Sequence, residues 1–424
     1  GSVAMLTRVQ PGDANARVTG LDIGSGRVIV YAGESTSWDS VSAMLLARAV
    51  GGLTPAQDGV PYAVGGNGIQ LQPGLGLSVE AQGDFTIDGQ LEADGAIRVT
   101  AGGSLTLADG GRVESGASGD AIVLAAADVF VNESEEEDAL SAANGRWLVF
   151  SATPVGGNRG GLAHSFRYYG VDFEDEWSNV LPQLGNGFVY SVVPQVTFEL
   201  RGSVQKVYDG TTAADLTGAS FVAATGIMPG ETVNLVGTPS QGQLDNPNAG
   251  NGKRVTADLS GVTLQVASSD VEGVEIFGYS LASTEAEGNI GVITARRVVL
   301  DGLGVADKVY DGTQTAQLTG LDSVVLRDQL GDFDVDELDA LMRNDDVALD
   351  TGGAWAKFVG NGNVGVNKLV EVGGFVLTNN GHGNYELVLP ADLRASITPR
   401  PVILDGLGVA DKVYDGTQTA QLTG

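Results

Sequence analysis

Short, mostly apolar triplets recur along the chain between Gly68 and Val131, with Gly, Asp or Asn between them. The triplets are Leu77–Val79, Phe85–Ile87, Leu91–Ala93, Ile97–Val99, Leu105–Leu107, Val113–Ser115, Ile122–Leu124 and Val129–Val131. An apolar, polar, apolar order is typical of a strand with its first and third side chains buried. The step along the chain from Leu77 to Ile97 equals the step from Phe85 to Leu105. Three short strands per ~20-residue coil, stacked at ~4.8 Å, predict a right-handed parallel β-helix.

The pattern changes on both sides of this region. After Gly110 the spacing between equivalent triplets becomes longer than this regular step, because turn residues are inserted. Upstream, Ser25–Ser35 has the pattern of a strand that runs into a loop. Val41–Val50 has apolar residues at helical as well as strand spacing. Because Met44, Leu45 and Ala49 fall near one face, a short helix lying on the β-helix is predicted.

The C-terminal half contains tandem repeats. Residues 300–320 and 404–424 have the identical sequence LDGLGVADKVYDGTQTAQLTG. A diverged third copy has the same Lys-Val-Tyr-Asp-Gly-Thr motif at Lys206–Thr211, and further landmarks keep step, such as Asn248–Lys253 with Asn363–Lys368. This self-similarity predicts modules of about 100 residues with variable loops on a fixed frame.

The repeated motif itself predicts a strand followed by a tight turn. Val207 alternates with Lys206 and Tyr208, and Asp209-Gly210 is the ordinary signal for a hairpin turn. The glycine is expected at positive φ, and so is Gly312 in the second copy. A binding role for the motif tyrosine is the alternative interpretation.

Composition supports an all-β chain with an acidic surface. The 424 residues include 63 Gly, 13 Pro and only 6% aromatic residues, which favours many tight turns between short strands. The net charge of −30 makes binding to nucleic acid or to an anionic membrane surface unfavourable. With no cysteine, disulfides and thiol catalysis are excluded. No apolar run is long enough to insert into a membrane as a helix.

Two family resemblances accompany these patterns. The ordered segments Ala127–Pro154, Phe166–Gly170 and Gly185–Phe198 resemble the end of the β-helical shaft in large filamentous-haemagglutinin-type adhesins exported by two-partner secretion, although this chain has an acidic turn at Glu133–Asp138. From about Val196 onward the chain resembles the YDG-type modules of bacterial surface proteins, which are small β-rich domains related to β-grasp units.

The resemblances imply an elongated rod with four segments. These are the end of a parallel β-helix at 1–195, YDG-type modules at 196–296 and 297–400, β-grasp-like or sandwich in form, and the truncated start of a third module at 401–424. The family also implies a secreted or cell-surface location, an outer-membrane transporter as export partner, and no membrane insertion by this segment.

Candidate chemistry is sparse in the sequence. The only histidines, His164 and His382, lie in different predicted domains and are expected to be surface turn or strand residues. A shift by one regular coil pairs Asp94 with Glu114 but Glu92 with Arg112, Asp84 with Ser104 and Asp88 with Ala108. One stacked acid pair does not indicate the two-carboxyl cleft that glycoside hydrolysis requires. The sequence assigns no catalytic, cofactor-binding or metal-binding residue.

Acidic runs and tryptophans are the remaining candidates. Glu133–Asp138 and Asp332–Asp339 could attract Ca²⁺ weakly, but solvated acidic loops are favoured, and Asp336–Leu341 has the spacing of a helical turn. Trp147 is expected in the core. An exposed tryptophan can stack on a sugar ring. The candidates for this are Trp38, Trp177 and Trp355, for which loop packing is the favoured interpretation.

These observations favour a structural and adhesive function over an enzyme. The chain is interpreted as a shaft and stalk segment that mediates cell–cell, surface or biofilm-matrix attachment. The first alternative is direct binding of exopolysaccharide or of a cell-surface glycan or protein. The second alternative is a β-helix enzyme that acts on glycans.

Overall fold

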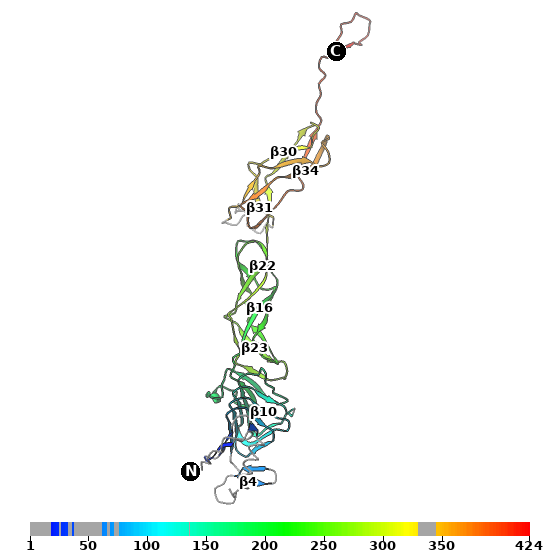
Figure 1. The fold of residues 1–424 in the computed structure, drawn as a ribbon. Coiled ribbons are helices and arrows are strands. Elements are labelled where there is room, and N and C mark those ends of the chain that lie inside the picture. Colours follow the sequence, from blue (N-terminus) through cyan, green and yellow to red (C-terminus); the bar gives the residue numbers. More distant parts are fainter. Residues whose placement is uncertain are drawn as a thin grey trace. The chain divides into compact units, whose positions relative to one another are not determined.

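The described residues of the computed structural model form strands joined by turns and loops (Figure 1). The structure describes five strands between residues 18 and 71, and then residues 76–134, 136–329 and 345–424. Within these residues the one helical element is the 3-10 turn Trp177–Asn179. The predicted all-β class is therefore confirmed. The helix predicted at Val41–Val50, Trp38 and the acidic segment Asp332–Asp339 lie outside the described residues.

The N-terminal strands form two sheets that are mostly parallel. The strands are β1 (Val18–Gly24), β2 (Arg27–Ala32), β3 (Thr36–Ser37), β4 (Tyr62–Gly65), β5 (Gly68–Leu71), β6 (Gly76–Ala81), β7 (Phe85–Ile87), β8 (Gln90–Ala93), β9 (Ile97–Ala101), β10 (Leu105–Leu107), β11 (Arg112–Ala126), β12 (Phe130–Asn132), β13 (Leu140–Ser151), β14 (Phe166–Tyr169) and β15 (Gly187–Tyr190). Strands β6, β9, β11, β13, β15 and β14 are consecutive neighbours in one sheet, and β7, β10 and β12 in another.

The predicted register holds where the chain spacing is regular. Leu77 pairs with Ile97 in the parallel ladder between β6 and β9, and Phe85 pairs with Leu105 between β7 and β10. Beyond Gly110 the offset increases, and Ile97 pairs with Ile122. Parallel ladders at these offsets place equivalent apolar residues directly above one another.

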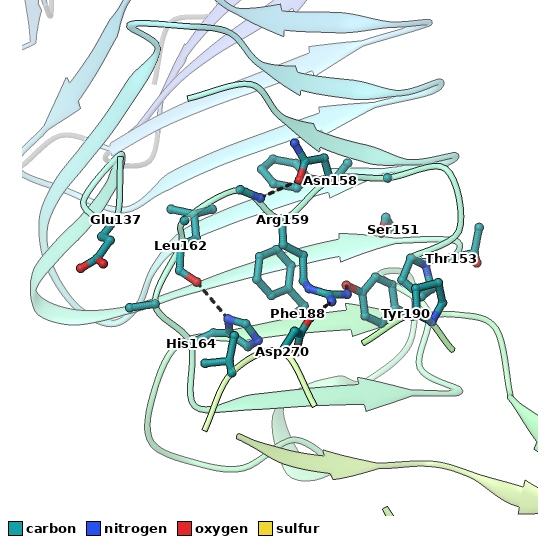
Figure 2. Close-up of a pocket in the computed structure, with 18 residues that line it drawn as sticks. Glu137, Ser151, Thr153, Asn158, Arg159, Leu162, His164, Phe188, Tyr190 and Asp270 are labelled. Carbon is teal, nitrogen blue, oxygen red and sulfur yellow. Dashed lines mark hydrogen bonds and ion pairs between the residues drawn. The ribbon is translucent and has the colours of Figure 1, made fainter. Parts of the chain in front are cut away.

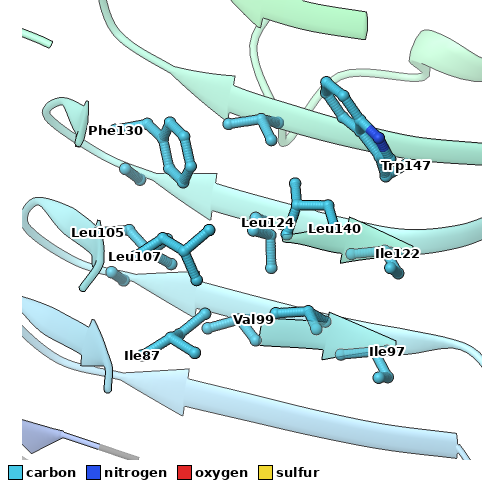
Figure 3. Close-up of a cluster of buried hydrophobic side chains, with 14 of the residues drawn as sticks. Ile87, Ile97, Val99, Leu105, Leu107, Ile122, Leu124, Phe130, Leu140 and Trp147 are labelled. Carbon is cyan, nitrogen blue, oxygen red and sulfur yellow. The ribbon is translucent and has the colours of Figure 1, made fainter. Parts of the chain in front are cut away.

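One apolar cluster fills the space between these strands. Ile97, Ile122 and Trp147 are register partners on three adjacent strands, and Figure 3 shows their side chains one above another. All three are at most 1% exposed. At about 25 cal/mol per Å² of buried apolar surface, such a stack is the main stabilising contribution of this part of the chain. Trp147 lies in the core, as predicted.

Two details of the predicted strands are wrong. Val113–Ser115 and Ile122–Leu124 are not separate strands, because β11 runs through both with register irregularities between them. At Val129–Val131 the buried face is shifted by one residue, so Phe130 and Asn132 point inward. Phe130 packs against Phe188 with ring centroids 6.1 Å apart, and the Asn132 amide donates to the carbonyl of Arg159 at 3.2 Å.

The C-terminal part carries the repeated modules. Its first strands are β16 (Gln195–Gly202), β17 (Val204–Val207), β18 (Ala213–Asp215), β19 (Ala219–Thr225), β20 (Glu231–Val236), β21 (Gln241–Leu244), β22 (Gly250–Asp258), β23 (Thr263–Ser268), β24 (Glu275–Phe277), β25 (Ser280–Leu281) and β26 (Glu285–Thr294). They are followed by β27 (Arg296–Asp301), β28 (Gly304–Ala306), β29 (Lys308–Val309), β30 (Thr315–Thr319), β31 (Val325–Asp328), β32 (Ala348–Asp350), β33 (Trp355–Phe358), β34 (Gly365–Gly373), β35 (Val376–Thr378), β36 (Tyr385–Val388), β37 (Arg394–Thr398), β38 (Gly408–Val409) and β39 (Leu422–Thr423).

The chain divides into two compact units. The first contains the chain up to Arg201 with Ser220–Pro239 and Ala257–Glu287, and the second contains Gly202–Ala219, Ser240–Thr256 and Gly288–Gly424. The division passes through the first repeated module. The first unit therefore combines the N-terminal strands with part of the first module, and the second unit combines the rest of the first module with the second module.

The Lys-Val-Tyr-Asp-Gly-Thr motif forms a turn fastened by its lysine. Lys308 Nζ lies 2.8 Å from Asp311 Oδ1 and donates to the Thr313 carbonyl at 2.8 Å. Asp311 Oδ1 also accepts from the backbone N and the Oγ1 of Thr313, both at 2.9 Å. The hydrogen bond from Lys308 and those from Thr313 hold the pKa of Asp311 below its usual range. Equivalent contacts recur around Lys206 and Lys412.

The predicted turn is confirmed, but the hairpin is not. Gly312 has φ +78°, the left-handed conformation that glycine adopts without steric cost. The strands on either side of the turn do not pair with each other. Strand β29 pairs in parallel with β37, whereas β30 pairs with β28 and β33. The lysine and aspartate, rather than a hairpin ladder, hold the turn.

A substitution at Gly312 tests the turn. Gly312→Val should lower the unfolding free energy of the second module by ~1 to 3 kcal/mol, because a β-branched residue is strained at positive φ. Gly381→Val is the matched control, since a Cβ at Gly381 has open space and its φ is not in the left-handed region. Denaturant unfolding followed by circular dichroism measures both. Equal stability of the two variants would contradict the assignment.

Candidate functional site

A buried carboxylate, Glu231, is the centre of the most polar cluster in the first unit. Its side chain has no exposed surface. Glu231 Oε1 accepts from the Tyr169 hydroxyl at 2.7 Å, and Oε2 accepts from the Tyr279 hydroxyl at 2.5 Å. Arg167 Nη1 adds a charged contact to Oε1 at 3.3 Å. A carboxylate removed from water needs hydrogen-bond donors that replace its lost hydration.

Arg167 joins the carboxylate to its surroundings. The Arg167 side chain is fully buried, and its Nη2 lies 2.5 Å from Asp270 Oδ1. Its Nε donates to His164 Nε2 at 3.1 Å. Arg159 Nη2 lies 2.7 Å from the other oxygen of Asp270. Two guanidinium groups thus face two carboxylates, and the charges of the cluster balance.

The cluster shifts the pKa values of its members. Burial raises the pKa of Asp270, but hydrogen bonds from Ser268, Arg167 and Arg159 outweigh it and hold that pKa well below its usual range. Burial, followed by the hydrogen bond to Glu231, raises the pKa of Tyr279. Asp270 therefore stays ionised and the Tyr279 hydroxyl stays protonated over the neutral range.

His164 is a neutral link in this network. Its Nδ1 donates to the Leu162 carbonyl at 2.9 Å, while Nε2 accepts from Arg167. Burial lowers the pKa of His164 to about 4 despite the Leu162 hydrogen bond. The ring also packs edge-on against Phe188, with centroids 4.9 Å apart. The expectation of a plain surface residue is wrong here, because the ring is half-buried and shared between two partners.

A pocket of about 470 Å³ opens beside the cluster. Figure 2 shows Arg159, Tyr190 and Asp270 converging at one wall of this pocket, and Arg159 Nη1 is 3.4 Å from the Tyr190 hydroxyl. His164 and Phe188 also line it. Because Arg159 and Asp270 are paired with each other, the charged groups at this wall are engaged in holding the structure.

A second cluster of the same design lies in the second unit. Asp345 Oδ2 accepts from the Tyr208 hydroxyl at 2.9 Å and from the Tyr385 hydroxyl at 2.6 Å. Both tyrosines are 3% exposed. A hydrogen-bonded pair supports the contact, since Asn384 donates to Asn248 at 3.1 Å.

The two clusters share their geometry. The rings of Tyr169 and Tyr279 meet edge to face at 5.3 Å and 77°, and those of Tyr208 and Tyr385 at 5.5 Å and 75°. Each carboxylate stands two positions before a buried valine, Val233 or Val347. We call each arrangement of two tyrosines and one carboxylate a tyrosine clasp.

Each clasp joins residues from separate parts of the sequence. Tyr169 ends β14, which pairs in parallel with β24, and Tyr279 follows shortly after the end of β24. In the second clasp Tyr208 belongs to the repeated motif of the first module, whereas Tyr385 and Asp345 belong to the next module. A buried arginine accompanies each clasp. Arg167 binds Glu231, and Arg296 donates to the Tyr208 carbonyl at 3.2 Å and contacts Asp328.

No pattern in the sequence predicts the clasps. Their tyrosines lie next to or near glycines with positive φ, such as Gly170, Gly210 and Gly278. The Phe166–Gly170 segment was noticed only for its family resemblance. The tyrosine–glycine proximity was the available signal, but nothing in the sequence links it to a carboxylate in a distant segment of the chain.

The other candidate residues lie apart from the clasps, except for His382. The exposed His382 lies in a turn, as expected, and lines the same pocket as Tyr208 and Asp345. Trp177 packs against Phe150 with ring centroids 5.2 Å apart. Trp355 is 42% exposed, with Lys357 Nζ 5.0 Å from its ring centroid.

The predicted carboxylate pairing is corrected by the register. Glu114 pairs with Glu92 and not with Asp94, because the offset between β8 and β11 is longer than the regular spacing of the triplets. The regular offset holds between Asp84 and Ser104, where Asp84 Oδ1 accepts from the Ser104 amide at 2.8 Å. In the acidic turn, Arg112 pairs with Glu136 and Asp138. Among the described residues, no group of three or more metal-ligating side chains is assembled. No helix in the described part of the chain is long and apolar enough to span a bilayer.

Comparison with known families identifies the repeated modules. Residues 194–273 and 294–393 each match the YDG domain. The predicted tandem YDG modules are thereby confirmed. No curated protein and no solved structure matches the chain significantly.

The buried ion pair of the first clasp predicts a large stability effect. Arg167→Met should lower the unfolding free energy of the first unit by about 3 to 5 kcal/mol, because it leaves the Glu231 carboxylate buried without its cation. Arg201→Met is the control, since the Arg201–Glu199 pair is exposed and should contribute about 0 to 1 kcal/mol. Urea unfolding measures both. Similar losses in the two variants would rule out a central role for Arg167.

Proposed function

We propose that this chain is a structural segment of a bacterial surface adhesin, a shaft and stalk that project a binding region. The direct joining of the two YDG modules carries the proposal. Strand β26 ends at Thr294 and β27 begins at Arg296, so Ala295 alone separates them. Strand β26 pairs with β17, whereas β27 pairs with β31 and β36. A connection of one residue leaves no flexible linker between modules.

We further propose that the N-terminal strands are coils of a right-handed parallel β-helix. The parallel ladders that pair Leu77 with Ile97 and Phe85 with Leu105 support this architecture, as does the apolar interior. Coils of this kind add length with little sequence complexity, and a net charge of −30 keeps neighbouring shafts apart. The YDG modules would be β-grasp-like spacers.

The family resemblance extends the proposal to export and location. A filamentous-haemagglutinin-like shaft would reach the cell surface or the extracellular matrix by two-partner secretion, with an outer-membrane transporter as its partner. Attachment of cells to one another, to surfaces or to biofilm matrix would follow. In this proposal the chain is not an enzyme.

Small-angle scattering tests the stalk. A compact protein of this length would have a radius of gyration near ~22 Å. We expect ~35 Å or more, and the value should persist at ~0.5 M salt, where repulsion between acidic surfaces is screened. A compact profile at high salt would show that charge repulsion, rather than architecture, extends the chain.

Glycan binding is a second candidate function, favoured by Trp355. Its ring is 42% exposed on β33, and an exposed indole can stack on a sugar. If this candidate is correct, the chain should bind members of a glycan array, Trp355→Ala should lose binding, and Trp355→Phe should retain part of it. Binding that survives Trp355→Ala would exclude Trp355 as the sugar-binding platform. If the parent chain binds no glycan, the structural role is the single proposed function that remains.

A further inference from the structure

The Lys-Val-Tyr-Asp-Gly-Thr turn occurs in both modules, with Tyr208 in the first and Tyr310 in the second, but the two turns have different environments. We call the turn around Tyr310, together with Asn363, Val364, Val366 and Arg400, the tip of the second module. The Tyr208 amide donates to the Thr294 carbonyl at 2.9 Å, and the Tyr310 amide donates to the Thr398 carbonyl at 2.9 Å. The backbone around the two tyrosines is therefore the same. Yet Tyr208 is 3% exposed and Tyr310 is 39% exposed. The difference comes from the clasp, which covers Tyr208 alone.

The residues that accompany Tyr208 have exposed counterparts in the second module. Arg296 is 4% exposed, whereas its counterpart Arg400 is exposed. Asn248 is half-buried against Asn384, whereas its counterpart Asn363 is exposed. Two apolar side chains next to Asn363 are also open to solvent. They are Val364 at 49% and Val366 at 86% exposure.

We propose that this tip is a docking surface for a further YDG module, which would cover Tyr310 by forming a third tyrosine clasp. The partner must present a carboxylate and a tyrosine hydroxyl, as Asp345 and Tyr385 do for Tyr208. Residues 404–424 repeat residues 300–320, so the sequence after Arg400 starts in the same way as the second module. A YDG module that begins with residues 404–424 is therefore the occupant to which the proposal commits.

A second copy of the described chain does not offer an open site. The Glu231 carboxylate is occupied by Tyr169, and that of Asp345 by Tyr208. Docking in trans would require one of these clasps to open. The inference rests on the tandem modules and not on adhesion, so a failure of the adhesive function would leave it standing.

The test completes a third module and follows the reactivity of Tyr310. Because residues 404–424 and 300–320 are identical, adding a second copy of residues 321–400 after Gly424 produces a full module with its own Asp345 and Tyr385. Nitration by tetranitromethane at pH 8, followed by peptide mass mapping, reports phenolate accessibility at each tyrosine. Burial, with the Asp345 hydrogen bond, raises the pKa of Tyr208 from 10.0 to about 12. A shift of that size lowers the phenolate fraction about 100-fold at this pH.

In the 424-residue chain Tyr310 should react rapidly and Tyr208 slowly. In the extended chain the nitration rate of Tyr310 should fall by about an order of magnitude or more, toward that of Tyr208. Asp345→Ala placed only in the added copy is the matched control, and it should restore the reactivity of Tyr310. Unchanged reactivity of Tyr310 in the extended chain would overturn the proposal. Concentration-dependent protection of Tyr310 in the 424-residue chain would also overturn it, by assigning the surface to a second copy.

Discussion

The hydrogen bonding of one carboxylate to two tyrosine hydroxyls is the constraint on which both described junctions depend. A carboxylate such as Glu231 costs several kcal/mol to remove from water unless donors replace the lost hydration. Tyr169 and Tyr279 supply those donors from separate parts of the sequence, so the carboxylate is satisfied only when both parts are in place. Asp345, which is half-buried, accepts hydrogen bonds from Tyr208 and Tyr385 in the same way. Apolar packing builds each segment, whereas the acid that two tyrosines share fixes how one segment meets the next.

This arrangement explains why the two compact units do not coincide with the sequence repeats. Each unit contains one clasp, and the first YDG module contributes to both. Its Glu231 receives Tyr169 from the preceding segment, while its own Tyr208 reaches Asp345 of the following module. A module of this kind has a tyrosine at one end and a carboxylate at the other. Such polarity is what head-to-tail assembly of identical parts requires.

The strands and their stacking could be predicted because they depend on local alternation and spacing. The offset that pairs Leu77 with Ile97 follows from the equal chain spacing of successive apolar triplets. The same reasoning failed at Glu114, because inserted residues after Gly110 changed the offset. The prediction for Phe130 is wrong because all three residues of its triplet are apolar. Alternation of apolar and polar residues therefore does not indicate which side chains point inward. The Asp-Gly turn is predicted correctly, but the lysine that binds its aspartate and a backbone carbonyl stabilises it in place of the expected hairpin pairing.

The clasps could not be predicted, since each joins residues far apart in a chain rich in acids. Tyr208 and Asp345 are separated by 137 positions, and no periodicity connects them. The fold alone determines which of the many carboxylates meets the two tyrosine hydroxyls. Their common design became visible once the ring geometry of the two clasps could be compared.

Distance measurement across the second clasp tests this account most directly. Spin labels at Gln241 and Gln317, which are exposed strand residues of the first and second modules, report the relative placement of the modules by pulsed electron resonance. The account predicts one narrow distance distribution in the parent chain and a broad one after Asp345→Ala. A distribution that is equally narrow in both, or broad in the parent chain, would contradict it.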